Sequence, residues 1–381
     1  MTELDLVLAD AVAERDVPFA VAMVTRSDGV TYSGAAGTAA EGRAAAEDTV
    51  FRIFSMTKAI GSTAAMILID RGQLSPDTPV GDILPAWNDL QVIDGWDGDS
   101  PILRAPRVRA TVRHLATHTS GIEYEFWSAD TAKYLQQTGQ PTILSGLEAA
   151  LAYPLTSDPG TRWGYGISID WLGRLVQEVD GRRIDRFCRE EILDPLGMTD
   201  TAFEADGLAD RMSDVSMRTP DGGFRPTKIA PPSHPELYGM GHALYSTAPD
   251  YIRFIRMILN DGQLEGNRIL SSEAMQTMRA DQMQGLTVQP MTSVAPPVSA
   301  DVNLFPGIRT SHSFAFLRND SDVPGKRSAG SLGWAGICNT HFWIDPARDL
   351  GAVLMTQSLP FAEPGLMKTY DAFERAVYAR R

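Results

Sequence analysis

A serine and a lysine three positions apart, Ser55 and Lys58, are the residues of this chain best suited to covalent chemistry. They lie in residues 50–72, a nearly uncharged segment that is rich in Ala and Met and ends at Gly72. This composition predicts a buried central helix, with Ser55 near its N-terminus and Gly72 as its C-cap. Positions i and i+3 share one helix face, so a hydroxyl would lie beside a desolvated amine. Such a pair is typical of an activated nucleophile.

A purely structural role is the alternative for both residues. Ser55 could serve only as an N-cap, Lys58 could extend to solvent, and Ser-x-x-Lys also occurs by chance. The choice of lysine favours chemistry, because the chain has five lysines against 29 arginines.

Tyr165 is a second candidate, because it stands between Gly164 and Gly166 after a Pro159-Gly160 turn. A tyrosine next to a lysine ammonium can have its pKa lowered and then act as a base. The alternative is an ordinary core or surface tyrosine.

The third candidate is the stretch 330–346, which reads Gly-Ser-Leu-Gly-Trp-Ala-Gly-Ile before a strand-like run. Small residues there allow close backbone approach, and backbone N–H groups could hold an oxyanion. A glycine-rich β-bulge is the alternative.

Other chemistries have weaker support. His114 and His118 have the i, i+4 spacing of zinc ligands, but the glutamate of His-Glu-x-x-His and an obvious third ligand are absent, so we expect no metal. Gly98-Asp99-Ser100 resembles the nucleophile block of another esterase class, yet it lies in a polar mid-chain loop. There is no Gly-x-Ser-x-Gly elbow and no phosphate-binding glycine loop.

Strand-like runs at both ends of the chain and helical patterns in the middle must position these residues. The expected helices, besides the serine helix, are residues 3–15, 112–116, 129–137, 142–152, 169–179, 184–196, 250–259 and 366–380, and the expected strands are 19–25, 30–34, 313–317, 336–344 and 350–357. Residues 92–106 are rich in Gly, Asp and Pro, and residues 283–306 read as a long loop, a kind that is usually functional or mobile.

This order of elements predicts an α+β fold with an antiparallel sheet flanked by helices. We expect one domain from residues 1–85 and 245–381, and an inserted, mainly helical domain from residues 86–244. The active site would lie in the cleft between them.

Composition sets broad limits. The chain has 381 residues, 43% of them hydrophobic, which suits a globular protein with an ample core. A net charge of −14 argues against nucleic acid or anionic membranes as partners. Cys188 and Cys338 are the only cysteines, and free buried thiols are expected. With no signal-like or membrane-spanning run, we expect a cytoplasmic protein.

The three candidate stretches, in this order, resemble the serine β-lactamase and penicillin-binding-protein superfamily. The resemblance is strongest to its class C β-lactamase-like esterase branch, the family VIII carboxylesterases. Further matching segments are Leu115-Ala116-Thr117-His118-Thr119-Ser120-Gly121, Gly72-Gln73-Leu74 with Asp77, Ser246-Thr247-Ala248 with Asp250, and Asp345-Pro346. Together the matches span roughly residues 15–360.

The resemblance implies roles for individual residues. Ser55 would be the acylated nucleophile, and Lys58 would take or relay its proton. Tyr165 would take the place of the family's tyrosine base and later protonate the leaving alkoxide. The backbone N–H groups of Ser55 and Ile337 would form the oxyanion hole. The resemblance implies no cofactor.

Two departures from the family pattern bear on the substrate. Ile167 stands where β-lactamases and transpeptidases usually carry Asn, and Trp334-Ala335-Gly336 stands where they carry Lys-Thr-Gly or His-Thr-Gly. The missing groups would bind a β-lactam carboxylate and amide, so we expect neutral, rather hydrophobic esters. The candidate substrate-binding residues are Trp334, Ala335, Gly336, Tyr124, Phe126 and Trp127.

The predicted function is therefore a carboxylesterase that forms an acyl-enzyme with short- to medium-chain esters, small molecules being its only expected partners. The alternatives are an amide hydrolase or D-peptidase, an acyltransferase or a weak β-lactamase that uses the same site. A non-catalytic penicillin-binding-like sensor is a more remote alternative. The oligomeric state, the natural substrate and the stereochemistry cannot be read from the sequence.

Overall fold

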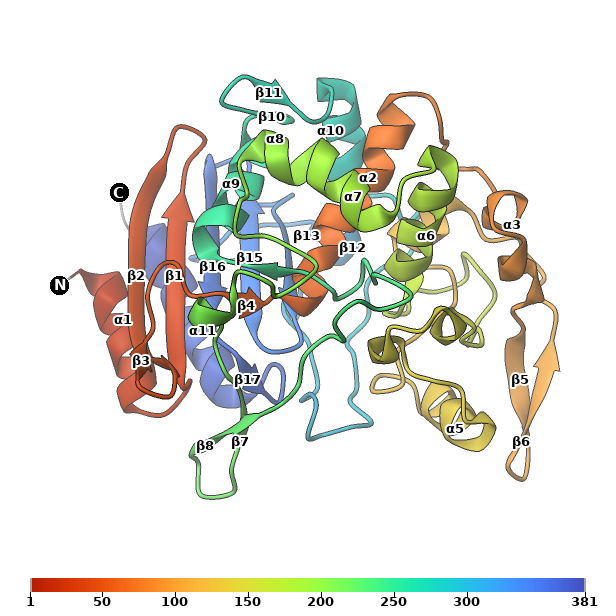
Figure 1. The fold of residues 1–381 in the computed structure, drawn as a ribbon, viewed down its shortest axis with the longest axis horizontal. Helices are drawn as coiled ribbons and strands as arrows, with labels where there is room; N and C mark the ends of the chain where they lie inside the picture. Colours follow the sequence, from red (N-terminus) through yellow and green to blue (C-terminus); the bar gives the residue numbers. More distant parts are fainter. Residues whose placement is uncertain (1, 380–381) are drawn as a thin grey trace.

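The computed structural model describes residues 2–379, and an eight-stranded sheet lies at its centre (Figure 1). In spatial order the strands are β12 (Thr310–His312), β13 (Leu317–Asn319), β14 (Leu332–Gly336), β15 (Thr340–Asp345), β16 (Leu350–Met355), β1 (Phe19–Thr25), β2 (Val30–Ala40) and β3 (Arg43–Ala44). Every neighbouring pair is antiparallel. The two ends of the chain therefore meet where β1 pairs with β16, and the predicted α+β class is confirmed.

Alternation along the strands divides the core between the two faces of this sheet. On β1 the even-numbered side chains pack against α1 (Glu3–Ala13) and α11 (Pro364–Ala379). The odd-numbered Val21 and Met23 belong to the larger core on the opposite face, which includes α9 (Ala248–Leu259). Period-two alternation thus lets one sheet bury both faces under helices.

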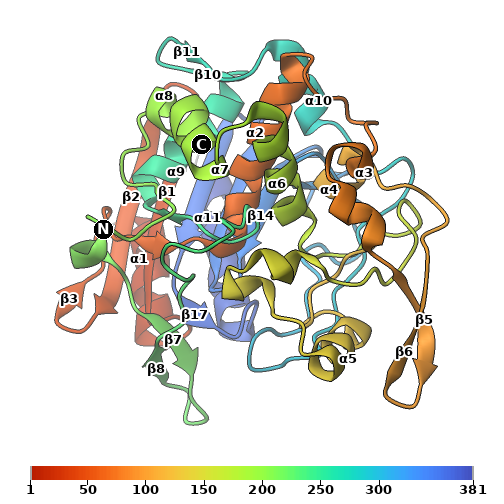
Figure 2. The same ribbon diagram turned by 45° about the vertical axis from the view of Figure 1, so that its right-hand side comes forward.

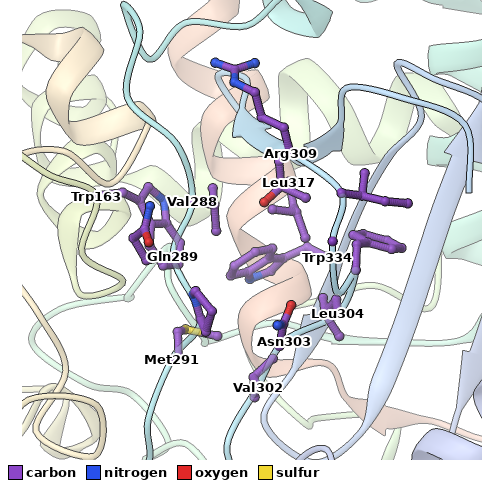
Figure 3. Close-up of a pocket in the computed structure, with 15 residues that line it drawn as sticks. Trp163, Val288, Gln289, Met291, Val302, Asn303, Leu304, Arg309, Leu317 and Trp334 are labelled. Carbon is purple, nitrogen blue, oxygen red and sulfur yellow. The ribbon is translucent and has the colours of Figure 1, made fainter.

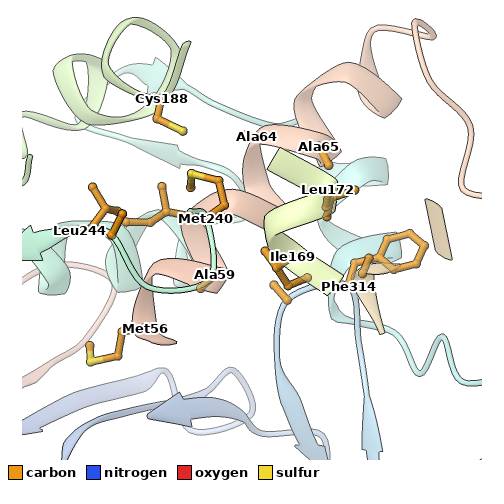
Figure 4. Packing of buried hydrophobic residues seen from close by; sticks show 14 of the residues in the cluster. Met56, Ala59, Ala64, Ala65, Ile169, Leu172, Cys188, Met240, Leu244 and Phe314 are labelled. Atoms are coloured by element: carbon orange, nitrogen blue, oxygen red, sulfur yellow. The ribbon is translucent and has the colours of Figure 1, made fainter. Parts of the chain in front are cut away.

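Helix α2 (Thr57–Asp70) is the buried helix predicted from the sequence, and all but its last two residues are buried. It packs on α6 (Ser168–Asp180), where Gly61 and Gly173 leave room for the side chain of Met240. Figure 4 shows Met240 beside Ala59 of α2 within this core. The glycines matter because a Cβ at Gly61 or Gly173 would lie 2.8 Å or 2.4 Å from an atom of Met240.

The other elements lie around this core. The remaining helices are α3 (Val80–Ile83), α4 (Val112–Ala116), α5 (Ala129–Thr138), α7 (Ile184–Cys188), α8 (Asp194–Leu196) and α10 (Ser272–Arg279). The smaller sheets pair β4 (Phe51–Arg52) with β9 (Tyr245–Ser246), β5 (Val92–Asp97) with β6 (Ser100–Arg104), β10 (Gln263–Leu264) with β11 (Asn267–Arg268), and β7 (Val215–Arg218) with β8 (Phe224–Thr227) and β17 (Ser358–Leu359). Helices α3 to α6 and the β5–β6 hairpin gather on the side away from α1 and α11 (Figures 1 and 2). The pairing of β7 with β17 joins the middle of the chain to its C-terminal part, and the domain boundaries at residues 85 and 244 stay a prediction.

Two expected helices differ from the structure. Residues 142–152 form two short 3-10 turns instead of one helix, because Gly146 between them has φ of +69° and ends the first turn. Residues 184–196 are helical, but a π-helical turn, Arg189–Leu193, separates α7 from α8.

The strand predictions also needed corrections. Residues 313–317 were expected to form a strand but instead contain the turn between β12 and β13, where the Ser313 hydroxyl accepts bonds from backbone N–H groups. Residues 336–344 divide between β14 and β15 at a turn in which Asn339 has φ of +67°. Residues 92–106 contain the β5–β6 hairpin, whose two-residue turn, Gly98-Asp99, is a recognised hairpin signal.

Three further predictions concern cysteines, membranes and metals. Cys188 and Cys338 are unpaired and buried. No helix within residues 2–379 has the length and apolar composition needed to span a membrane. The same residues contain no group of three or more His, Cys, Asp or Glu side chains arranged to hold a metal ion.

Candidate active site

The predicted nucleophile, Ser55, lies at the junction of the sheet and α2. It occupies a 3-10 turn, Phe54–Met56, immediately before the helix, so it lies near the helix N-terminus as expected, while Met56 takes the N-cap position. Phe54 has φ of +41°, a conformation that is costly for a residue with a Cβ. Backbone strain of this kind persists where the surrounding structure enforces it, often at functional sites. The Ser55 side chain is almost fully buried but lines a cavity.

Lys58 lies one turn further along and contacts three oxygen atoms. Its Nζ donates to Ser55 Oγ (3.1 Å), to the Tyr124 hydroxyl (2.9 Å) and to the Gly241 carbonyl (2.8 Å). Burial lowers the pKa of Lys58 to about 7, against an opposing effect of the Asp170 charge. A neutral amine keeps two N–H donors, enough for the Tyr124 and Gly241 oxygens, and can turn its lone pair toward Ser55. The geometry therefore allows Lys58 to accept the serine proton at neutral pH.

Tyr165 completes the group predicted from the sequence. Its hydroxyl accepts a hydrogen bond from Trp334 Nε1 at 3.1 Å, and its ring centroid lies 4.8 Å from Lys58 Nζ. Burial raises the pKa of Tyr165 although hydrogen bonds with Ser55 and Trp334 act in the opposite direction. The sequence argument that a nearby ammonium would lower this pKa is therefore wrong, because burial dominates. Tyr165 is a neutral phenol and suits a proton donor better than a resident base.

The segments that would supply the oxyanion hole come together beside Ser55. Ile337 follows the last residue of β14, and it lines the same cavity as Ser55. A Cβ at Gly336 would lie 2.4 Å from the Ile53 carbonyl oxygen, so only glycine lets β14 approach the serine turn this closely. The roles of the Ser55 and Ile337 N–H groups stay a prediction.

The predicted substrate-binding residues take different positions. Trp127, Trp334 and Ala335 line the cavity at Ser55. Tyr124 instead belongs to the hydrogen-bonding group around Lys58, and Phe126 stacks on the Tyr124 ring at a centroid distance of 4.8 Å. The arrangement thus places Tyr124 and Phe126 as support for Lys58 rather than in the wall of that cavity.

Several cavities have Trp334 in their walls, and two adjoining ones bear on the site. The first, which we call the Ser55 cavity, has about 360 Å³ of empty space, part of it open to solvent, and is lined by Ser55, Trp127, Tyr165, Met291, Val302, Leu304, Trp334, Ala335, Ile337 and Phe361. The second, the Trp163 cavity, has about 850 Å³, also partly open to solvent (Figure 3). It shares Met291, Val302, Leu304 and Trp334 with the first and adds Trp163, Gln289 and Arg309, among others. Apart from Ser55 and the hydroxyl of Tyr165, the Ser55 cavity is apolar.

The long segment 283–306 forms much of the wall of both cavities, as its length and position suggested. It crosses toward the α5 side, where the Val294 N–H bonds to the Phe126 carbonyl at 3.0 Å. Met291 and Val302 pair in an isolated antiparallel bridge within it. These contacts hold the segment over Ser55.

Two histidines pack behind Tyr165 and Trp334. The His118 ring meets the Tyr165 ring edge-on at 4.9 Å, and the His312 ring meets that of His118 at 5.3 Å. Burial lowers the pKa of both imidazoles, that of His312 to about 4. His114 bonds to the Thr111 N–H as part of a helix cap. His114 therefore caps a helix, and His118 supports the ring of Tyr165.

The comparisons with known proteins agree with this geometry. The family model described as beta-lactamase matches residues 4–376. The chain belongs to the β-lactamase family. Its placement in the serine β-lactamase and penicillin-binding-protein superfamily is thereby confirmed, within an enzyme family of serine hydrolases and acyltransferases.

Individual relatives of this β-lactamase-family protein include both transferases and an esterase. It is 29% identical over 348 residues to monacolin J acid methylbutanoyltransferase of Aspergillus terreus, covering 87% of this chain and 83% of that protein. It is 28% identical over 347 residues to lovastatin esterase of Penicillium rubens, covering 87% and 86%. Among solved structures, unliganded simvastatin synthase (LovD) from Aspergillus terreus superimposes with a TM-score of 0.86 at 27% identity, covering 99% of this chain and 97% of that one.

Sequence reasoning missed three groups that contact or influence Lys58. Tyr124 was assigned to the pocket, while the Gly241 carbonyl and the Asp170 carboxylate were not considered. One signal was available for Gly241, because two glycines flank a methionine in Gly239-Met240-Gly241 before a strand. Lys58 lies on α2, Asp170 on α6 and Gly241 in a distant loop. No local sequence pattern shows that residues of these segments lie close together.

Proposed function

We propose that this protein is a serine esterase that forms an acyl-enzyme on Ser55 from neutral, short- to medium-chain carboxylic esters. The observation that carries the proposal is the 3.1 Å contact between Lys58 Nζ and Ser55 Oγ, with the pKa of the amine near 7. An amine that is neutral at the working pH is a competent general base for a hydroxyl within hydrogen-bond reach.

The proposed reaction moves one proton through the site. Lys58 takes the Ser55 proton while Oγ attacks the ester carbonyl, and the oxyanion that forms is held by the N–H groups of Ser55 and Ile337. Tyr165 gives its proton to the departing alkoxide and regains one from Lys58. An acyl-enzyme and a free alcohol result, with no net change in the protonation of the site. Deacylation runs the same steps in reverse with water or another hydroxyl.

The lining of the Ser55 cavity supports the proposed substrate class. Met291, Val302, Leu304, Ile337 and Phe361 present no charge to a bound acyl group. A β-lactam would lack the lysine and asparagine partners that Trp334 and Ile167 replace. We therefore propose small, uncharged esters as the partners of this site. We also propose that the protein is a family VIII carboxylesterase and that it is located in the cytoplasm.

Acyl transfer to an alcohol is the second candidate, and two observations favour it. The Trp163 cavity, about 850 Å³, adjoins the Ser55 cavity and could hold an acceptor larger than water. Two of the similar proteins described above, one of known sequence and one of known structure, bear the names of a methylbutanoyltransferase and simvastatin synthase.

Hydrolysis and acyl transfer are tested by measuring how the acyl group divides between water and an added alcohol. Initial rates on p-nitrophenyl acetate, butyrate and octanoate should exceed the rate on nitrocefin, a β-lactam. An added apolar alcohol should yield its butyrate ester, measured by chromatography, in competition with free butyrate. Nitrocefin turnover faster than that of all three esters would contradict the proposed substrate class. Free acid as the only product at high alcohol concentration would contradict acyl transfer and leave hydrolysis.

A further inference from the structure

A buried carboxylate behind Lys58 has no part in the reaction proposed above. Asp170 is the third residue of α6 and is 1% exposed. Its Oδ1 accepts a hydrogen bond from the Gly241 N–H at 2.9 Å, and no hydrogen-bond partner contacts its Oδ2 among the described residues. A buried carboxylate with an unused oxygen is expensive, even at a helix N-terminus where the dipole favours it. Such a group calls for an explanation beyond stability.

The loop that contacts Asp170 also holds the lysine. The carbonyl of Gly241, the residue whose N–H bonds to Asp170, accepts the 2.8 Å hydrogen bond from Lys58 Nζ. A Cβ on Gly241 would lie 2.4 Å from Asp170 Oδ2, and one on Gly239 would lie 2.6 Å from Oδ1. The Asp170 carboxylate therefore approaches the backbone of Gly239 and Gly241 more closely than a residue with a Cβ would allow.

The same loop is fixed from the other side. Met240, between these two glycines, is fully buried and occupies the space that Gly61 of α2 and Gly173 of α6 leave open (Figure 4). Movement of the Gly241 carbonyl away from Lys58 would therefore require Met240 to leave a packed site. The hydrogen bond to Asp170 and the packing of Met240 together fix the position of the Gly241 carbonyl.

The charge of Asp170 acts on the lysine as well. Around Lys58 the titratable groups are Tyr124 and Tyr165 at ring or hydrogen-bond distance, with His118 and His312 beyond them. Burial raises the pKa of both tyrosines and lowers that of both histidines, so these four groups are neutral near pH 7. Asp170 is the charged group that favours the ammonium form of Lys58. His242 faces Asp170, with its Nδ1 3.5 Å from Oδ1.

We propose that Asp170 is a positioning residue for Lys58: it fixes the Gly241 carbonyl that orients the amine, and its negative charge sets how readily the amine takes up a proton. The proposal rests on Ser55 and Lys58 acting as nucleophile and base, as proposed above. It predicts two separable effects, one of charge and one of position.

The rate at which a fluorophosphonate labels Ser55, followed from pH 5 to pH 9, measures both effects without a natural substrate. Asp170→Asn keeps an oxygen that can accept from Gly241 but removes the charge. Its labelling should retain the wild-type plateau within a few fold, while the midpoint of the acid limb moves down by about one pH unit. Asp170→Ala also removes the hydrogen bond, and its plateau should fall about 10-fold or more because the base is misplaced.

Asp250→Asn is a matched control. Asp250 is also a buried carboxylate at the third position of a helix, α9, but it bonds to the Asp200 N–H and the Thr201 hydroxyl, away from Lys58. Its acid limb should coincide with that of the wild type. Thermal unfolding checks that each variant is folded, and Asp170→Ser, which should show the same shift, replaces Asp170→Asn if the latter does not fold.

The possible failures are distinguishable. An acid limb in Asp170→Asn that coincides with those of the wild type and Asp250→Asn would overturn the charge effect, and a plateau in Asp170→Ala equal to that of the wild type would overturn the positional effect. Either result leaves the proposed function intact. Absence of labelling at Ser55 in the wild type would overturn both, because the nucleophile itself would then be wrong.

Discussion

Lys58 is buried and has a pKa near 7. The desolvation that makes an ammonium expensive in the interior is the same effect that makes the amine available as a base. The pKa near 7 results from this penalty and from the opposing charge of Asp170. Burial of this lysine is thus a condition for its proposed chemistry.

The titration of Lys58 predicts the pH dependence of activity. Above pH 7 the amine is neutral and can accept the Ser55 proton, whereas below pH 7 it is protonated and cannot. The rate constant for acylation by p-nitrophenyl butyrate should therefore fall about tenfold per pH unit on the acid side of a midpoint near 7. Stopped-flow release of p-nitrophenol between pH 5 and pH 9 measures this. A rate that does not change over that range would exclude Lys58 as the base.

The indole of Trp334 offers a second test at a single atom. Trp334→Phe keeps an aromatic ring in the cavity wall but removes the N–H that bonds to the Tyr165 hydroxyl. Loss of one such hydrogen bond is worth about 1 kcal/mol, so kcat/KM should fall about 5-fold. Trp127→Phe is the control, because Trp127 lines the same cavity while its Nε1 has no hydrogen-bond partner among the described residues. Equal effects of the two substitutions would show that ring size, not the N–H, accounts for the loss.

At the scale of elements, the site depends on how α2 and α6 pack around one methionine. Met240→Ala would empty a fully buried position and should destabilise the protein by about 2–5 kcal/mol. It should also lower kcat, because the neighbouring Gly241 carbonyl would lose its fixed position.

Met278→Ala separates these two consequences. Met278 is equally buried but belongs to α10, outside the active site. Urea unfolding should show losses of similar size for both variants, while only Met240→Ala changes kcat. A normal kcat in Met240→Ala would contradict the view that this packing positions the lysine.

Local sequence patterns predicted secondary structure well where an element is buried along most of its length. The apolar runs of β1 and α2 follow from burial on both faces of a strand and on all sides of a helix, and both elements are confirmed. The predictions failed where a single residue redirects the backbone, as at Gly146 and Ser313. They also failed to identify the 92–106 hairpin, although its turn carries a Gly-Asp pair.

The site was predictable only in part for a related reason. Ser55 and Lys58 are neighbours on one helix, so their contact could be inferred from their spacing. Tyr124, Asp170 and Gly241 approach Lys58 from three separate elements, which no periodicity relates. The direction of the Tyr165 pKa shift was wrong because its burial depends on the packed rings of His118 and Trp334.

At the scale of the whole molecule, the sheet joins the two ends of the chain and so assembles the site. The N-terminal part brings Ser55, the middle brings Tyr165, and the C-terminal strand β14 brings Trp334. The segment 283–306 then contributes residues to the walls of both the Ser55 cavity and the Trp163 cavity. A substrate that reaches Ser55 is thus surrounded by parts of the chain that are distant in sequence.

The measurement that tests this account most directly is the mass of the protein after reaction with a slowly turned-over ester or a fluorophosphonate. The account predicts one adduct per chain, located by peptide mapping on Ser55, together with loss of both labelling and ester turnover in Ser55→Ala. An adduct on any other residue, or turnover that survives in Ser55→Ala, would contradict it.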